Sequence, residues 1–310
     1  TSSGSSVVYA TAGVGIVLTW KENDDGSLAS VDQRFFTGHT NDILCLKVDK
    51  SRNYAATGQG PIRKTQAGQD VDPVVCVWCV HSMQELSRLP HRPEPLQKLT
   101  PHAPDKKPVP GQKLDGCGGV QAVEFSERGD LLMTACRNLA STIFVWKWRT
   151  ESLVYRVNTK SGVPPQIYNI KWNPVESADG SKLFDFASYG NKHIYFWKED
   201  LADGKPAPTN EDYPRSWTKE AGSFANLTPT MGSGAVQDVF ACEFLRNGNV
   251  VTGMSSGDIY VWKAKGAPEP GRPAKMLADK RLTIPGTDPS MPKTRAHVHT
   301  CSVLKIRWIK

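Results

Sequence analysis

A short apolar strand that ends in tryptophan recurs along this chain. Its clearest copy is segment 258–262 (Asp-Ile-Tyr-Val-Trp), which follows the turn Ser255-Ser256-Gly257. A repeated strand with one fixed aromatic end is the signature of a repeat architecture. The strands of this kind end at Trp20, Trp78, Trp146, Trp197 and Trp262.

Each tryptophan strand is the third strand of a longer unit. An alternating apolar strand comes first, as in 120–125, and a turn containing Gly or Asp leads to a second strand, as in 131–136. A weaker fourth strand is expected after each tryptophan. Four antiparallel strands per repeat are typical of a β-propeller blade. We therefore predict an all-β chain, with one propeller segment over 1–310.

The ends of the chain predict incomplete units. A further blade opens near residue 300 and stops at Lys310, and the first residue is Thr1 rather than methionine. A propeller closes by pairing its two termini in one blade. We therefore expect this sequence to be part of a longer protein, which supplies the rest of the ring.

Two long segments rich in proline and basic residues interrupt the repeats. They cover 90–113 and 263–295. Proline removes a donor from a β-ladder and is excluded from sheet interiors. We predict that both segments are loop inserts on the surface.

The basic loop residues are the candidate partner-binding residues. The net charge is +7 and the pI is near 9.0, which favours an acidic partner. Binding residues concentrate in loops. The alternative is that these side chains are only solvated. The candidates are Arg63, Lys64, Lys106, Lys107, Lys113, Lys263, Lys265, Lys275, Lys280 and Arg281.

Motifs that could carry metal or catalytic chemistry are weak. Cys76-x-x-Cys79 on a strand points its thiols to opposite faces, and no second pair follows at zinc-ligand spacing. His297-x-His299-x-Cys301 shares one face but has no fourth ligand nearby. No nucleophile, base and orienting group come together. We predict no catalytic residue, no cofactor, no metal, no small-molecule substrate and no enzymatic activity.

Composition also bounds the compartment and the partners. The chain has seven cysteines, an odd number, and those on apolar strands are predicted to be buried free thiols in a reducing compartment. No apolar run approaches the roughly 20 residues of a membrane span, and no secretory signal opens the chain. Aromatic residues are not interleaved with the basic runs, so nucleic acid is not an expected partner. The strand cysteines are Cys45, Cys76, Cys136, Cys242 and Cys301.

The repeat resembles the WD40 unit. Gly38-His39 precedes an inner strand, although the residue after each terminal tryptophan is lysine or cysteine rather than aspartate. Longer segments resemble the echinoderm microtubule-associated protein-like (EMAP-like) family. These are 35–46, 56–59, 191–197 and 247–262.

The resemblance implies a tandem atypical propeller, of which this chain would be most of one half. It implies that His39 forms a hydrogen bond within its blade, and we expect the terminal tryptophans to pack between blades. Propellers of this family bind tubulin or other microtubule or axonemal proteins, in the cytoplasm or in a cilium, without catalysis. Basic loops would then attract the acidic tails of tubulin. The alternative is an adaptor that binds another protein without touching tubulin.

Overall fold

The structure is a computed structural model. It describes residues 5–61, 73–91, 118–137, 141–159, 167–176, 182–199, 217–224, 238–266, 271–282 and 303–306. Nearly all regular structure in these ranges is strand, with one short 3-10 helix, η2 (Trp148–Thr150). None of the helices described has the length and apolar character needed to cross a membrane.

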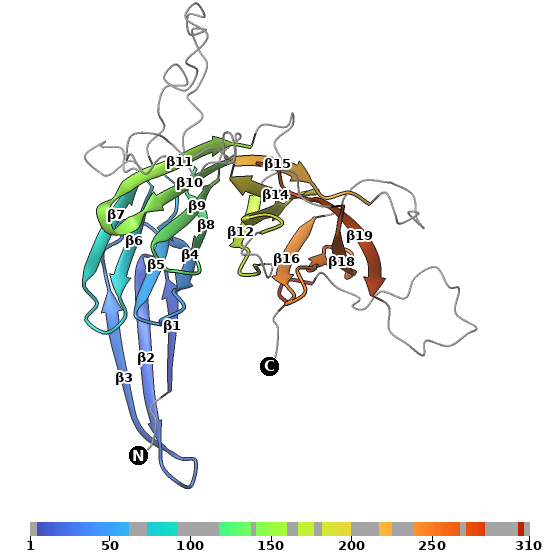
Figure 1. Cartoon of the computed structure of the whole chain (residues 1–310). Helices are drawn as coiled ribbons and strands as arrows, with labels where there is room; N and C mark the ends of the chain where they lie inside the picture. The colour runs from blue at the N-terminus through green and yellow to red at the C-terminus, as the bar shows by residue number, and fades with distance from the viewer. Residues whose placement is uncertain are drawn as a thin grey trace, which may run out of the picture. The chain divides into compact units, whose positions relative to one another are not determined.

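The strands form antiparallel sheets in chain order (Figure 1). The first sheet has the order β1-β2-β3, with β1 (Ser5–Thr11), β2 (Val14–Glu22) and β3 (Leu28–Phe36). The second has four strands, β4 (Ile43–Val48), β5 (Tyr54–Gln59), β6 (Val74–Cys79) and β7 (Glu85–Pro90). The third has β8 (Val120–Phe125), β9 (Leu131–Cys136), β10 (Thr142–Lys147) and β11 (Ser152–Asn158).

Two further four-stranded sheets follow in the same order. The fourth contains β12 (Ile167–Trp172), β13 (Phe186–Gly190), β14 (His193–Glu199) and β15 (Trp217–Ala221). The fifth contains β16 (Val239–Phe244), β17 (Val250–Met254), β18 (Ile259–Lys265) and β19 (Lys275–Leu282). The all-β architecture of four-stranded antiparallel sheets is as predicted.

The chain divides into two compact units. Unit 1 is Thr1–Pro164 and contains the first three sheets, and unit 2 is Pro165–Lys310 and contains the other two. In unit 1, Trp78, Leu132 and Trp148 are almost fully buried. In unit 2, Phe184, Phe196 and Trp262 lie in one buried cluster. Each unit therefore has an apolar core of its own.

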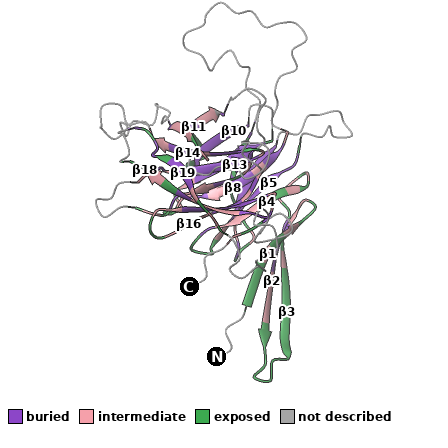
Figure 2. Cartoon of the chain, turned by 90° about the vertical axis from the view of Figure 1, so that its right-hand side faces the viewer, coloured by how far each residue is buried: buried purple, intermediate pink, exposed green. Residues whose placement is uncertain are grey.

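Several central strands of the four-stranded sheets, among them β5, β6, β9, β10, β13 and β17, are buried along most of their length (Figure 2). Strands β6 and β10 have five buried residues in succession, and β13 is buried throughout. A strand covered on both faces needs no polar face, so its sequence is a continuous apolar run. This explains why these strands stand out in the sequence.

The first sheet is much more exposed than the others. Strand β3 is exposed along most of its length. Trp20 lies on β2, the middle strand of this sheet, but its side chain is only half-buried. Its indole N–H donates a hydrogen bond to Glu22 at 3.0 Å. The packing expected of the terminal tryptophans therefore does not hold for Trp20. Exposed large apolar residues of this sheet include Val7, Tyr9, Leu28, Val31 and Phe35.

The prediction of a loop over 263–295 is wrong for 263–265 and 275–282. The first part continues β18, and the second is β19, which pairs with β18 from Lys265 opposite Lys275 to Ile259 opposite Leu282. Met276 and Leu277 are buried and hold β19 on the sheet. The prolines that flank this short strand led to the prediction of a loop. Residues 283–295 lie outside the described ranges.

The prediction for 90–113 is tested only at its start, where Pro90 ends β7. Residues 92–113 lie outside the described ranges. Near the predicted last blade, residues 303–306 are described and are not a strand. The Val303 N–H nevertheless donates to the Met254 carbonyl at 3.1 Å, so this segment lies against the C-terminal end of β17.

Candidate functional site

One hydrogen bond recurs in all four four-stranded sheets. The indole N–H of the terminal tryptophan donates to a Thr or Ser hydroxyl on the second strand of the sheet. Both partners are buried, so the bond satisfies two polar groups that are shielded from water. The donor–acceptor pairs are Trp78–Thr57 at 3.1 Å, Trp146–Thr134 at 3.4 Å, Trp197–Ser188 at 2.9 Å and Trp262–Thr252 at 2.8 Å.

In two sheets of unit 1, a histidine contacts the same threonine hydroxyl that accepts from the tryptophan. His39 Nε2 lies 2.7 Å from Thr57 Oγ1, and its Nδ1 lies 3.3 Å from Gln59 Oε1. His91 Nε2 lies 2.7 Å from Thr134 Oγ1. Burial lowers the pKa of both imidazoles from the usual 6.5 to about 4. Both rings are therefore neutral near pH 7 and act as structural groups.

The hydroxyl partners and His91 were not identified from the sequence. A signal does exist, since Thr57, Thr134, Ser188 and Thr252 each occupy an inner position of a second strand that is otherwise mostly apolar. A polar residue at the same place in successive repeats indicates a shared hydrogen-bond partner. His91 has no preceding glycine and therefore does not match the Gly-His pattern of His39.

The cysteines differ from the prediction at one position. Cys136 is disulfide-bonded rather than free, and its partner lies outside the described residues. The sequence pattern does not separate paired from unpaired cysteines on buried strands. Cys45, Cys76 and Cys242 are free, and burial raises the pKa of each thiol to about 12.

No metal-binding group is present in the described part of the chain, where no three His, Cys, Asp or Glu side chains gather. Cys76 is buried and Cys79 is only half-buried. The motif at His297, His299 and Cys301 lies outside the described residues. The candidates Arg63, Lys64, Lys106, Lys107 and Lys113 also lie outside them.

The remaining basic candidates lie on β18 and β19. Lys265 is directly opposite Lys275, and both side chains are exposed. Lys263 lies on the same face of β18 and forms an ion pair of 2.9 Å with Asp279. Lys280 is opposite Val261 and is also exposed. Directly opposed residues share one face of a sheet, so these four lysines form one basic surface, called here the lysine face.

Arg281 is not part of the lysine face. Its guanidinium donates through Nε and Nη2 to one carboxylate oxygen of Asp258, at 2.8 Å and 2.7 Å. Asp258 is 4% exposed. A buried carboxylate needs such a partner, so Arg281 stabilises Asp258, and the partner-binding role expected for it stays a prediction.

The lysine face carries unbalanced charge. Like charges directly opposite each other on a sheet are destabilising, and Lys265 and Lys275 have no ion-pair partner among the described residues. The same holds for Lys280. An acidic surface or a flexible acidic segment could supply the missing charge.

Comparison with known proteins agrees with the repeat pattern. The family model "WD domain, G-beta repeat" matches residues 30–79, which include His39 and Trp78. Echinoderm microtubule-associated protein-like 2 of Mus musculus is 28% identical over 262 residues, which is 83% of this chain and 31% of that protein. Echinoderm microtubule-associated protein-like 4 of Mus musculus is 24% identical over 293 residues, 92% of this chain and 23% of that protein.

The chain thus spans a third or less of the length of these relatives. Among solved structures, the C-terminal WD40 domain of Sif2 is 11% identical, with a TM-score of 0.47, and the match covers 97% of this chain and 59% of that one.

Proposed function

We propose that this divergent EMAP-like WD40 protein is a scaffold, not an enzyme, that associates with microtubules through the lysine face. The observation that carries the proposal is the opposed pair Lys265 and Lys275, which has no acidic partner among the described residues. The names of the curated relatives describe them as microtubule-associated. A location on cytoplasmic or ciliary microtubules is part of the proposal.

Charge complementarity supports tubulin as the partner. Tubulin presents acidic C-terminal tails, and a tail lying along β18 and β19 would relieve the repulsion between Lys265 and Lys275. Exposed charges of this kind mainly raise the rate of encounter and are screened by salt, with a Debye length of about 8 Å at physiological ionic strength. Lys263 is partly neutralised by Asp279 and should contribute less.

The test is co-sedimentation of the full-length protein with microtubules at low and moderate salt. Exposed ion pairs are each worth up to about 1 kcal/mol, so the triple variant K265E/K275E/K280E should bind about tenfold more weakly or worse. Microtubules whose tails have been removed with subtilisin should bind the unmodified protein with a similar loss.

The matched control is K21E/R128E/R246E, which changes exposed basic residues elsewhere on the chain. Both triple variants lower the net charge from +7 to +1, because each change removes two charges. The control should pellet like the unmodified protein. Equal losses in both variants would show that net charge, and not the lysine face, determines binding.

Failure of the full-length protein to pellet would instead favour an adaptor without direct tubulin contact. Cross-linking mass spectrometry on native material separates the two functions. A dominant partner other than tubulin would overturn the microtubule proposal.

A further inference from the structure

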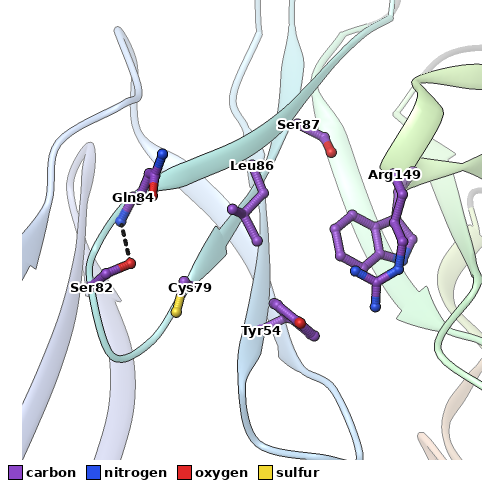
Figure 3. A pocket seen from close by; sticks show the side chains of 8 residues that line it. Tyr54, Cys79, Ser82, Gln84, Leu86, Ser87 and Arg149 are labelled. Carbon is purple, nitrogen blue, oxygen red and sulfur yellow. Dashed lines mark hydrogen bonds between the residues drawn. The ribbon is translucent and has the colours of Figure 1, made fainter.

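A pocket of about 420 Å³ lies in unit 1 between β7 and η2 (Figure 3). Its walls come from the start of β5, the turn after β6, the strand β7 and the short helix after β10. None of its residues belongs to the lysine face or to the tryptophan–hydroxyl bonds. The side chains that matter here are Tyr54, Cys79, Leu86, Ser87, Trp148 and Arg149.

Arg149 is the one charged residue among those that line the pocket. Its guanidinium carbon lies 4.1 Å from the ring centroid of Trp148 and 5.0 Å from that of Tyr54. Trp148 is fixed in turn, since it is 1% exposed and donates to the Gly129 carbonyl at 2.8 Å. Stacking of this kind holds the guanidinium plane and leaves its N–H edge available for a planar acceptor.

The acidic residues near the pocket do not pair with Arg149. Glu85 forms an ion pair with Arg88 at 2.7 Å. Glu151 accepts a hydrogen bond from the backbone N–H of Arg88 at 2.8 Å. In the described part of the chain Arg149 has no ion pair, so its charge is available to a ligand.

Ser87 provides a second, independent sign of a ligand. It is 2% exposed, and its hydroxyl has no hydrogen-bond partner in the described structure. A buried hydroxyl without a partner is costly and rare. Figure 3 shows Ser87 and Arg149 at the same end of the pocket, with the Ser87 hydroxyl on that side. An acceptor bound there could satisfy both groups.

The chemistry of the pocket selects the charge of the ligand. A cationic ligand would need a free aromatic face, but Arg149 already covers Trp148 and lies over Tyr54. A phosphate dianion carries about two charges, whereas the lining supplies one cation. A carboxylate has the right charge and the right planar geometry. Leu86, which is 39% exposed, offers an apolar contact beside it.

We propose that this pocket binds a peptide segment in which an aspartate or glutamate stands beside an apolar residue. The carboxylate accepts hydrogen bonds from Arg149 and Ser87, and the apolar side chain packs on Leu86. The site is separate from the lysine face, and the proposal does not depend on microtubule binding.

The test uses the full-length protein and a fluorescent twelve-residue peptide that contains several Glu-Leu pairs. Fluorescence anisotropy should show saturable binding, and the matching Gln-Leu peptide should bind at least about tenfold more weakly, since hydrogen bonds to a charged group are among the stronger ones. R149A should lose about the same factor. R128A, in an exposed turn of the same sheet, is the control and should bind the peptide normally.

The variant S87A separates binding from folding. Its hydroxyl has no partner in the free protein, so S87A should not lower the thermal midpoint, yet it should weaken peptide binding several-fold. Equal affinity for the Glu-Leu and Gln-Leu peptides would overturn the proposal, as would preferred binding of a trimethyl-lysine or phosphoserine peptide.

Cys79 gives a readout that does not depend on affinity. It is a free thiol on the pocket wall, and hydrogen bonding by Ser82 lowers its pKa, whereas burial raises that of Cys45, Cys76 and Cys242 to about 12. A maleimide should therefore label Cys79 first among these four cysteines.

Bound Glu-Leu peptide should slow the labelling of Cys79, as measured by mass spectrometry. Unchanged labelling at saturating peptide would contradict a site in this pocket. K265E/K275E/K280E should bind the peptide normally, so failure here is distinguishable from failure of the microtubule proposal.

Discussion

At the residue scale, one buried hydrogen bond joins the second and third strands of every four-stranded sheet. In the fifth sheet it runs from Trp262 to Thr252, and both residues are 0% exposed. T252V keeps the shape of the side chain but leaves the indole N–H unpaired. It should lower the free energy of unfolding by about 1–3 kcal/mol, measured by urea denaturation.

T252S is the matched control because it keeps the hydroxyl. It loses one methyl group and should cost only about 0.8 kcal/mol. If T252V and T252S prove equally stable, the hydroxyl contributes nothing and the pair is held by packing alone.

The two histidines that contact the threonine hydroxyls, His39 and His91, predict a pH dependence of stability. The pKa of His39 and of His91 is about 4 in the folded protein, against 6.5 for an unperturbed imidazole. The unfolded chain therefore binds more protons between these values, so stability should fall as the pH falls from 6.5 to 4. Each histidine contributes a loss of the order of 1–3 kcal/mol.

H91Q keeps hydrogen-bonding groups at this position but cannot titrate. Its urea midpoint should vary less between pH 6.5 and 4 than that of the unmodified protein. H81Q, at an exposed position, is the control and should keep the original profile. If the stability of H91Q falls with pH as steeply as that of the unmodified protein, protonation of His91 is not a cause of the pH dependence.

The tryptophans could be predicted at this scale, and their partners could not. Trp78 and Trp262 repeat at strand ends with the same apolar approach. Their acceptors lie on another strand, at separations of 21 and 10 residues along the chain, and the acceptor is Thr in three repeats and Ser in one. The repeated Thr or Ser marks candidate partners in the sequence, but the structure is needed to show which groups meet.

At the scale of elements, two glycines allow neighbouring segments to approach a strand closely. A Cβ on Gly58 would lie 2.5 Å from Cys45 Sγ and 2.9 Å from Val120 Cβ, where β8 crosses β5. A Cβ on Gly253 would lie 2.6 Å from Val303 Cβ. Each glycine directly follows the threonine that accepts from the tryptophan. In each of these two strands, the threonine therefore binds the indole and the next residue allows the close approach of a neighbouring segment.

G58A should therefore destabilise unit 1 by about 1–3 kcal/mol through overpacking, measured by urea denaturation. The double variant G58A/V120A tests the mechanism, because alanine at 120 removes the 2.8 Å contact with Val120 Cγ1 and leaves the contact with Cys45 Sγ in place. G58A should cost less in the V120A background than in the unmodified protein. An equal cost in both backgrounds would exclude steric contact with Val120 as the cause.

The third strands and the first strands of the sheets could be predicted from apolar runs and alternation. A fourth strand is expected after Trp262, but its place in the sequence could not be predicted. In β19 the buried run Met276-Leu277-Ala278 is short and is followed by charged residues. Pro268, Pro270 and Pro273 precede it. Composition over the whole segment therefore indicated a loop. The pairing with β18 holds these residues in a strand and places the lysines on one face.

At the scale of the whole molecule, the repeats continue through both units. The boundary lies at Pro164 and Pro165, between Trp146 and Trp197, and the interval between these two tryptophans resembles the other intervals. The sequence therefore predicts the blades but not their division between two cores. The exposure of the first sheet agrees with the sequence of β3, in which Asp32, Gln33 and Arg34 are polar.

The net charge of +7 leads to the last prediction, which concerns salt. If the lysine face makes the electrostatic contact, raising the salt from about 50 to about 200 mM should weaken microtubule binding, because screening shortens the reach of exposed charges. K265E/K275E/K280E should show a shallower salt dependence than the unmodified protein. K21E/R128E/R246E has the same net charge as that variant but keeps the lysine face.

The two variants separate local charge from total charge. A steep salt dependence retained by K21E/R128E/R246E and lost by K265E/K275E/K280E would locate the contact on β18 and β19. Equally shallow curves would mean that the protein is attracted as a whole, since net charge acts on long-range encounter without selecting a face. Co-sedimentation over a salt series with both variants decides between these outcomes, because only the position of the three changes differs.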